Sequence, residues 1–247
     1  MGNNRRFPGA CCCAIVRVEQ AHAANSLSLP MQHAKRLVSA LGVSLPSRSP
    51  SDGAALLISG VGSPFLTPLY TASAIVRTWA QSLPEFLVWI SLICILFVGV
   101  GFCYVLIQTL RGKISDVHVS ESSQRQGPFA VAVCSSIVGI FALWWIGVPG
   151  PLIALGTAFA FQGIIFALLT RWAKISMHVA VAASCVTTLV WLFGWVAVPL
   201  LGFLPLQGWA RMRRGRHTLG QVILGAGLAP VLTLAMLLSW WAIGRGG

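Results

Sequence analysis

Residues 86–110 read FLVWISLICILFVGVGFCYVLIQTL, a run of 25 residues that contains no charged side chain. An α-helix rises about 1.5 Å per residue, so about 20 apolar residues are enough to cross the roughly 30 Å hydrocarbon core of a bilayer. A run of this length and composition predicts a transmembrane helix.

The remainder of the sequence repeats this pattern. Of the 247 residues, 56% are hydrophobic and 9% are charged, and the mean hydropathy is +0.81, well above the values of soluble domains. We therefore expect an all-α fold, a polytopic integral membrane bundle of about six to seven transmembrane helices. Besides residues 86–110, the apolar segments are 54–76, 129–148, 152–170, 177–193, 195–209 and 218–243.

Proline and glycine mark the boundaries between several of these segments. Residues 149–151 read Pro-Gly-Pro and separate the third segment from the fourth, because no helix continues through such a sequence. The fifth and sixth segments meet at Gly194, and the sixth contains Pro199 and Pro205. An alternative is that residues 177–209 form one long tilted span, which would move every later loop to the other side of the membrane.

The first 52 residues differ from the rest. They are rich in Ser, Ala and Arg and contain only two acids, Glu19 and Asp52. This composition is typical of an organellar targeting peptide and equally of a disordered basic cytoplasmic tail. Cys11–Cys13 have no partner at the spacing of a metal site or a disulfide framework. We expect a tail at 1–52 and a membrane domain at 53–247.

The basic residues are unevenly distributed. If all seven segments cross, the tail and the loops 111–128, 171–176 and 210–217 share one side and hold 15 of the 17 Lys and Arg. Cytoplasmic loops of membrane proteins carry such an excess, so this side is predicted to face the cytoplasm, or the stroma or matrix in an organelle. The net charge of +12 then indicates contact with anionic lipid headgroups, not with nucleic acid.

The same side carries a constellation suited to phosphate chemistry. His178 begins one apolar segment and His217 precedes another, and Arg211 lies in the same loop as His217. An arginine can donate two parallel hydrogen bonds to phosphoryl oxygens, and helix N-termini favour bound anions. One histidine could attack phosphorus while the other protonates the leaving oxygen.

These residues resemble a known family. Arg211, five residues, His217, three residues and Gln221 are similar to the third motif of the type 2 phosphatidic acid phosphatase and vanadium haloperoxidase superfamily, which reads Ser-Arg, five residues, His, three residues, Asp. Residues 175–178, Ile-Ser-Met-His, stand where the family has Pro-Ser-Gly-His. The resemblance covers the chain from about residue 111 to the C-terminus.

The resemblance implies a role for each matching residue. His217 would be the nucleophile that forms a phosphohistidine, His178 the general acid, and Gln221 would stand in place of the aspartate that orients the nucleophile. The family's first motif, Lys, six residues, Arg-Pro, is not intact, since Lys113 is followed by Arg125 at a longer spacing. The implied phosphate-binding candidates are Arg211, Ser176, Lys113, Arg125 and Lys174.

The resulting hypothesis is a membrane phosphatase that hydrolyses a lipid or isoprenoid phosphate or diphosphate without a metal or other cofactor. Its partners would be membrane lipids and an amphiphilic phosphate substrate. The alternative is a catalytically silent relative that binds lipid or assists assembly, because Gln221 supplies no charge to the histidine. A transporter is disfavoured, since the spans carry no ionisable residue near mid-bilayer.

Two further groups of polar residues receive a simpler interpretation. Asp116 and His118 are interpreted as polar loop surface and not as a metal pair. Arg213, Arg214 and Arg216 are interpreted as anchors for lipid headgroups, in contrast to Arg211.

Overall fold

The computed structural model describes residues 49–119 and 121–245. Every regular element within these ranges is helical and none is a strand, so the predicted all-α fold is confirmed. All of them belong to one compact unit, residues 45–247. Most of the expected tail, including Cys11–Cys13, lies outside the described residues. The first described helix begins at Pro50, slightly before the expected domain boundary.

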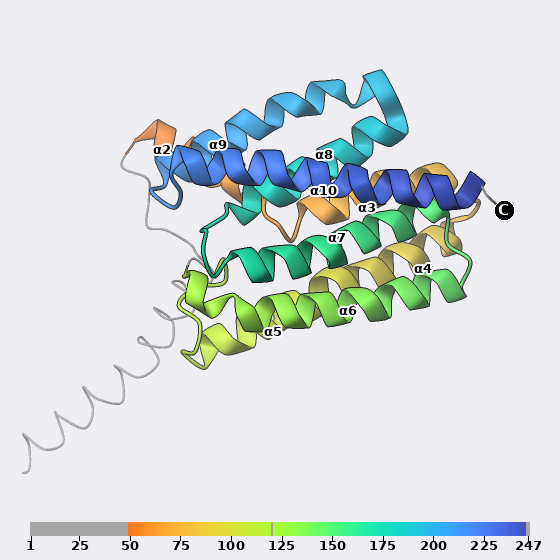
Figure 1. Cartoon of the computed structure of the whole chain (residues 1–247), viewed down its shortest axis with the longest axis horizontal. Coiled ribbons are helices and arrows are strands. Elements are labelled where there is room, and N and C mark those ends of the chain that lie inside the picture. Colours follow the sequence, from red (N-terminus) through yellow and green to blue (C-terminus); the bar gives the residue numbers. More distant parts are fainter. Residues whose placement is uncertain (1–48, 120, 246–247) are drawn as a thin grey trace, which may run out of the picture. The chain divides into compact units, whose positions relative to one another are not determined.

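The helices follow one another as an antiparallel series that runs back and forth along the unit (Figure 1). In chain order they are α2 (Pro50–Val61), α3 (Thr67–Trp79), α4 (Leu83–Ile93), the π-helical turn η1 (Cys94–Gly99), α5 (Val100–Leu110), the 3₁₀ turn η2 (Ser122–Gln124), α6 (Gln126–Trp145), α7 (Gly150–Leu169), α8 (Met177–Phe193), the 3₁₀ turns η3 (Gly194–Val196) and η4 (Val198–Gly202), α9 (Phe203–Arg213) and α10 (Leu219–Arg245).

Five helical stretches are long and apolar enough to cross a membrane, which fits a helical membrane bundle. Large apolar side chains such as Phe141, Trp145 and Val231 are exposed on the surface of the bundle, as expected where a protein meets lipid. The five stretches are Leu83–Leu110, Ser122–Trp145, Gly150–Leu169, Met177–Val196 and Leu219–Ala242.

The first predicted segment, 54–76, is not one helix. It is divided into α2 and α3, because Pro64 cannot donate the backbone hydrogen bond that a continuous helix needs and its ring would clash with the preceding turn. The side-chain amide of Gln207 on α9 donates to the carbonyl oxygen of Gly62 at 2.8 Å and holds the break in place. The expectation of a single continuous span in this region was therefore wrong.

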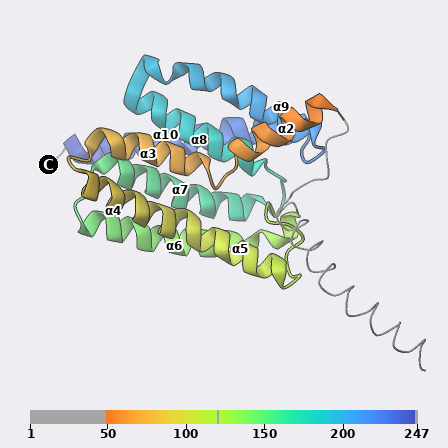
Figure 2. The ribbon, with the colours of Figure 1, turned by 180° about the vertical axis from the view of Figure 1, so that it is seen from behind.

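The sixth predicted segment, 195–209, also differs from a regular span. Gly194 has a φ of +59°, a conformation that favours glycine, and it ends α8. Two 3₁₀ turns follow before α9, and α9 packs against α8 on its return (Figure 2). Residues 177–209 therefore form a hairpin and not one tilted helix.

The antiparallel order brings three loops to one end of the bundle. These are the loops between α5 and α6, between α7 and α8, and between α9 and α10, and the start of α2 joins them (Figures 1 and 2). We call this the basic end. The opposite end contains the short turns at residues 80–82, 146–149 and 194–197, together with Arg77 in the last turn of α3.

Polar contacts tie the centre of the bundle together. Gln162 on α7 donates from its side-chain amide to Thr233 on α10 at 2.8 Å and accepts from Ser184 on α8 at 2.7 Å. All three side chains are buried. The network joins three helices, and a second, apolar cluster around Ile75, Leu143 and Leu152 fills the bundle nearer the opposite end.

Candidate active site

Arg125 fastens two loops of the basic end to each other. Its side chain is 4% exposed, and its guanidinium donates from Nε to the Val119 carbonyl at 3.0 Å and from Nη1 to the Ile175 carbonyl at 3.1 Å. These contacts join the α5–α6 loop to the residue that precedes Ser176. Arg125, a predicted phosphate-binding candidate, thus uses two of its donors to position the loops.

The start of α8 lies directly against the start of α10. The backbone N–H of Ser176 donates to the carbonyl oxygen of Gln221 at 3.3 Å. This approach requires Gly225, since a methyl group there would lie 2.9 Å from the Ser176 carbonyl oxygen. The contact places the two predicted motifs, 175–178 and 211–221, side by side.

Gln221 fixes the tautomer of His217. The backbone N–H of Thr218 donates to Oε1 of Gln221 at 3.3 Å, which identifies that atom as the acceptor oxygen of the amide. Nδ1 of His217 lies 3.0 Å from the same oxygen and must therefore carry the proton. In the neutral ring Nε2 then holds a lone pair, as a nucleophilic histidine requires.

Arg211 is set apart from the other arginines of its loop. Its side chain is 3% exposed and donates from Nη1 to the hydroxyl of Ser59 on α2 at 2.8 Å, while its Nε has no hydrogen-bond partner among the described residues. Arg213, in contrast, is exposed and pairs with Asp52 at 3.0 Å. Arg211 is therefore buried with an unpaired N–H, whereas Arg213 forms an ion pair on the surface.

Ser176 and His178 contribute two more unpaired atoms. Ser176 precedes the first turn of α8 but its hydroxyl makes no capping hydrogen bond. The Ser176 Oγ and the His178 Nε2 are both buried and have no partner within the described part of the chain. An unpaired buried polar atom costs about 1–3 kcal/mol, so the three unpaired atoms of Ser176, His178 and Arg211 at the basic end favour a binding site there.

A third histidine joins the site and was not predicted. The ring of His118, from the α5–α6 loop, stacks on the ring of His178 with centroids 5.3 Å apart and an interplanar angle of 23°. Asp116 accepts the backbone N–H of His118 at 2.8 Å and orients it. The interpretation of His118 as plain loop surface was wrong, and no spacing in the sequence signals this contact.

The electrostatics of the site favour a bound anion. Burial first, and then the charge of Arg211, lower the pKa of His118 to about 4. Burial also lowers the pKa of His217 to about 4, although its hydrogen bond to Gln221 acts in the opposite direction. Arg214 and Arg216, in the loop after Arg211, add two further positive charges to this end. Positive charge is concentrated here without enough acids to balance it.

The remaining predicted residues fall into two groups. Lys174 is half-buried and acts electrostatically on His217, so it lies within reach of the site. Lys113 is exposed on the α5–α6 loop, and its side chain makes no hydrogen bond or ion pair to the described residues. Within 49–119 and 121–245 no group of three His, Cys, Asp or Glu side chains is placed to hold a metal ion.

Comparisons with known proteins add no relative. No protein-family model matches the chain, and neither a curated protein nor a solved structure is significantly similar to it.

Proposed function

We propose that this protein is a membrane phosphatase that hydrolyses a lipid or isoprenoid phosphate or diphosphate at the basic end of its bundle, as its motifs resembling the type 2 phosphatidic acid phosphatases imply. The observation that carries the proposal is that three buried side chains of the basic end, Ser176, His178 and Arg211, each keep a polar atom that has no hydrogen-bond partner among the described residues. The hydrogen bond from the Ser176 N–H to the Gln221 carbonyl oxygen, and that between His217 and the Gln221 side chain, bring the starts of α8 and α10 together.

The reaction would proceed in two displacements. The lone pair on Nε2 of His217 attacks phosphorus, the bond from phosphorus to the ester oxygen breaks, and His178 gives that oxygen a proton. Water then attacks the phosphohistidine, His178 takes up its proton, and the nitrogen–phosphorus bond breaks to release inorganic phosphate. Arg211 and Ser176 would donate hydrogen bonds to the phosphoryl oxygens throughout.

Arg211 carries the charge stabilisation that the phosphoryl group needs. A dianionic phosphate would offset the uncompensated positive charge of this end and supply the counter-charge for a proton on the buried His178. Gln221 holds Nδ1 of His217 but adds no negative charge, so the imidazolium character that develops during attack is stabilised less than by a carboxylate. We therefore expect a slow enzyme.

The distribution of charge suggests how the site is oriented. Seven alternating crossings, two of them made by the broken segments 50–79 and 198–213, would place all three site loops on one side of the membrane. That side holds the excess of Lys and Arg, which favours the cytoplasm, or the stroma or matrix of an organelle. The substrate headgroup would then be met at the level of the lipid phosphates.

Release of phosphate by the purified full-length protein in detergent tests the proposal. Phosphatidic acid and a prenyl diphosphate are offered in the presence of a chelator, and His217→Ala and His178→Ala are each expected to abolish the release. Arg213→Ala serves as the matched control, because Arg213 pairs with Asp52 on the surface, and its rate should stay within about twofold of wild type. Equal rates for wild type and His217→Ala on every substrate would leave the silent lipid-binding relative as the better account.

A further inference from the structure

An apolar cavity begins beside the candidate active site. Its volume is about 130 Å³, and Phe129, Phe166 and Met177 line it near the basic end. Phe97 and Phe159 line it further along the bundle. A cavity with such walls tends to exclude water and to accept an apolar ligand.

The cavity and the polar site are built from the same stretches of chain. The start of α8 supplies His178 to the site and Met177 to the cavity. The stretch that enters α6 supplies Phe129 to the cavity and Arg125, which holds the loop before Ser176 in position. Along the chain, Met177 and Phe129 therefore lie within about one helical turn of His178 and Arg125. An amphiphile with its phosphate at the site would have its apolar part at the mouth of this cavity.

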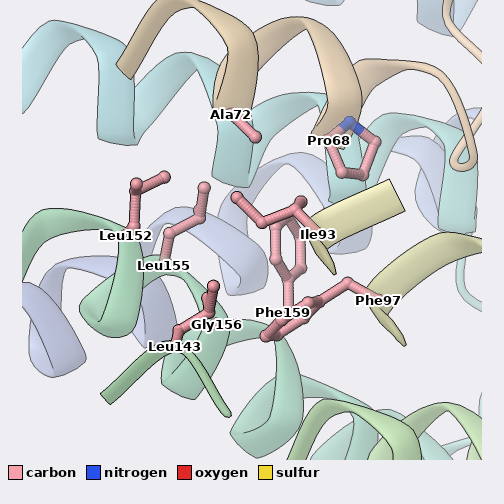
Figure 3. Close-up of a pocket in the computed structure, with 9 residues that line it drawn as sticks. All are labelled: Pro68, Ala72, Ile93, Phe97, Leu143, Leu152, Leu155, Gly156 and Phe159. Carbon is pink, nitrogen blue, oxygen red and sulfur yellow. The ribbon is translucent and has the colours of Figure 1, made fainter. Parts of the chain in front are cut away.

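A second, smaller void continues in the same direction. It has a volume of about 20 Å³, space for about one water molecule, and its lining is apolar, including Leu143 and Leu152. It shares Pro68, Phe97 and Phe159 with the larger cavity, and Figure 3 shows the rings of Phe97 and Phe159 next to each other at its edge. These shared side chains form the partition between the two spaces.

The ring of Phe97 is held firmly in this partition. Phe97 lies in the π-helical turn η1, an irregularity that is frequent at functional sites. Its ring fits between two helices only because they carry glycine there: a methyl group at Gly139 on α6 would overlap the ring, and one at Gly156 on α7 would lie 2.8 Å from it. The π-turn and the two glycines place this side chain across the path.

We propose that the larger cavity holds the hydrocarbon tail of the phosphate substrate and that Phe97 sets the longest tail that fits. Along α7 the larger cavity extends from Phe166 to Phe159, about 10 Å, and the path would reach about 20 Å if it continued to Leu152. The identity of the headgroup in this inference rests on the proposed function. The tail-binding part rests on the cavity alone.

The polar residues in the cavity wall do not call for a polar ligand. The amide of Gln162 is already hydrogen-bonded to Thr233 and Ser184. Of the other lining residues, Ser136 is the one hydroxyl, and the rest carry aliphatic, aromatic, thioether or no side chains. A saturated or prenyl chain matches this surface.

The test measures binding separately from catalysis. Single-chain n-alkyl phosphonates of increasing length, which cannot be hydrolysed at phosphorus, are titrated by calorimetry into the full-length protein at a fixed detergent concentration. Wild type should gain affinity with each added carbon up to an intermediate length and then gain none. Phe97→Ala should move that limit to longer chains by several carbons, and Ala132→Leu, which fills the larger cavity, should move it to shorter ones.

Phe102→Ala is the matched control, because Phe102 lies on the same long helix and packs on Phe65 but lines neither cavity. Its length limit should equal that of wild type. A limit that is the same in wild type, Phe97→Ala and Ala132→Leu, or affinity that rises without limit in all of them, as partition into micelles would give, overturns the inference. Since phosphonates are not turned over, a protein without phosphatase activity can still pass or fail this test.

Discussion

The two ends of the bundle differ in how their connections treat polar groups. At the opposite end the helices are joined by short turns, two of which contain a glycine with positive φ, Gly147 and Gly194, and Arg77 lies exposed on the surface. At the basic end longer loops bury Arg211, His178 and Ser176 and leave a polar atom of each without a partner. The turns of the opposite end, all of them within the described residues, connect helices without burying unpaired polar groups in them. The basic end buries unpaired polar groups, which lower the stability of the ligand-free protein.

Buried polar groups without partners at one end of a protein are typical of a functional site. Burying charge and unpaired donors reduces stability unless a ligand compensates, so such groups persist where binding or catalysis needs them. The basic end also contains a second kind of arginine, Arg125, whose donors are satisfied by backbone carbonyls. We therefore assign Arg125 a structural role and Arg211 a role in binding the phosphoryl group.

The largest effect is expected from that pair. Arg211→Leu should lower phosphate release at least 100-fold, because a main charge on the phosphoryl group is lost, while the melting temperature is unchanged or higher. Arg125→Leu should lower the stability by about 2–3 kcal/mol by leaving two buried carbonyl oxygens without their donor. Rates and thermal unfolding in detergent measure both, with Arg77→Leu as the control from the opposite end. A large loss of stability in Arg211→Leu would contradict the assignment.

A smaller gain in rate is expected at Gln221. Gln221→Asp should raise phosphate release about tenfold, because a carboxylate near Nδ1 of His217 stabilises the developing positive charge. Gln221→Glu keeps the length of the side chain and should give the same gain if the Asp carboxylate is too short to reach Nδ1 of His217. Gln221→Leu should lose activity, since it cannot hold the tautomer. No response to either acid would argue against His217 as nucleophile.

The pH dependence of stability should be confined to the basic end. His118 and His217 have pKa values of about 4 in the folded protein and 6.5 as the unperturbed value, so the unfolded chain binds more protons between these limits. Stability from these groups is fully present above pH 6.5 and is lost as the pH falls toward 4. Melting temperatures at pH 7.5 and 5.0 should differ by less in His118→Gln and in His217→Gln than in wild type. An identical difference in all three proteins would show that these rings do not titrate as described.

The smallest effect is expected in the centre of the bundle. Gln162→Leu removes contacts to Thr233 and Ser184, but the Thr233 hydroxyl still donates to the Ala229 carbonyl, and the Ser184 hydroxyl can turn its one proton to the Ala180 carbonyl. The loss should be about 1 kcal/mol or less, with phosphate release within about twofold of wild type. A drop in rate comparable to that of Arg211→Leu would mean that the network, and not the basic end alone, controls the chemistry.

The sequence predicts the helical bundle well because apolar runs of about 20 residues have few other stable arrangements. Ser176, His178, Arg211, His217 and Gln221 were selected by their resemblance to family motifs, and the structure brings Ser176 into contact with Gln221, while their catalytic roles stay predictions. Local chemistry at Pro64 and at the 3₁₀ turns after Gly194 broke two of the expected spans into shorter helices. Ser59 and His118 could not have been assigned to the site, since only tertiary packing brings them to Arg211 and His178.

The proposed reaction requires that Nε2 of His217 attack phosphorus at the basic end and form a phosphohistidine. Rapid quenching of wild type with a ³²P-labelled lipid phosphate, followed by peptide mapping, tests it most directly. We predict an acid-labile, base-stable phosphoryl label on His217 that is absent from His217→Ala and present in Arg213→Ala. Release of phosphate by wild type without any label on His217, or a label that persists in His217→Ala, would show that His217 is not the nucleophile.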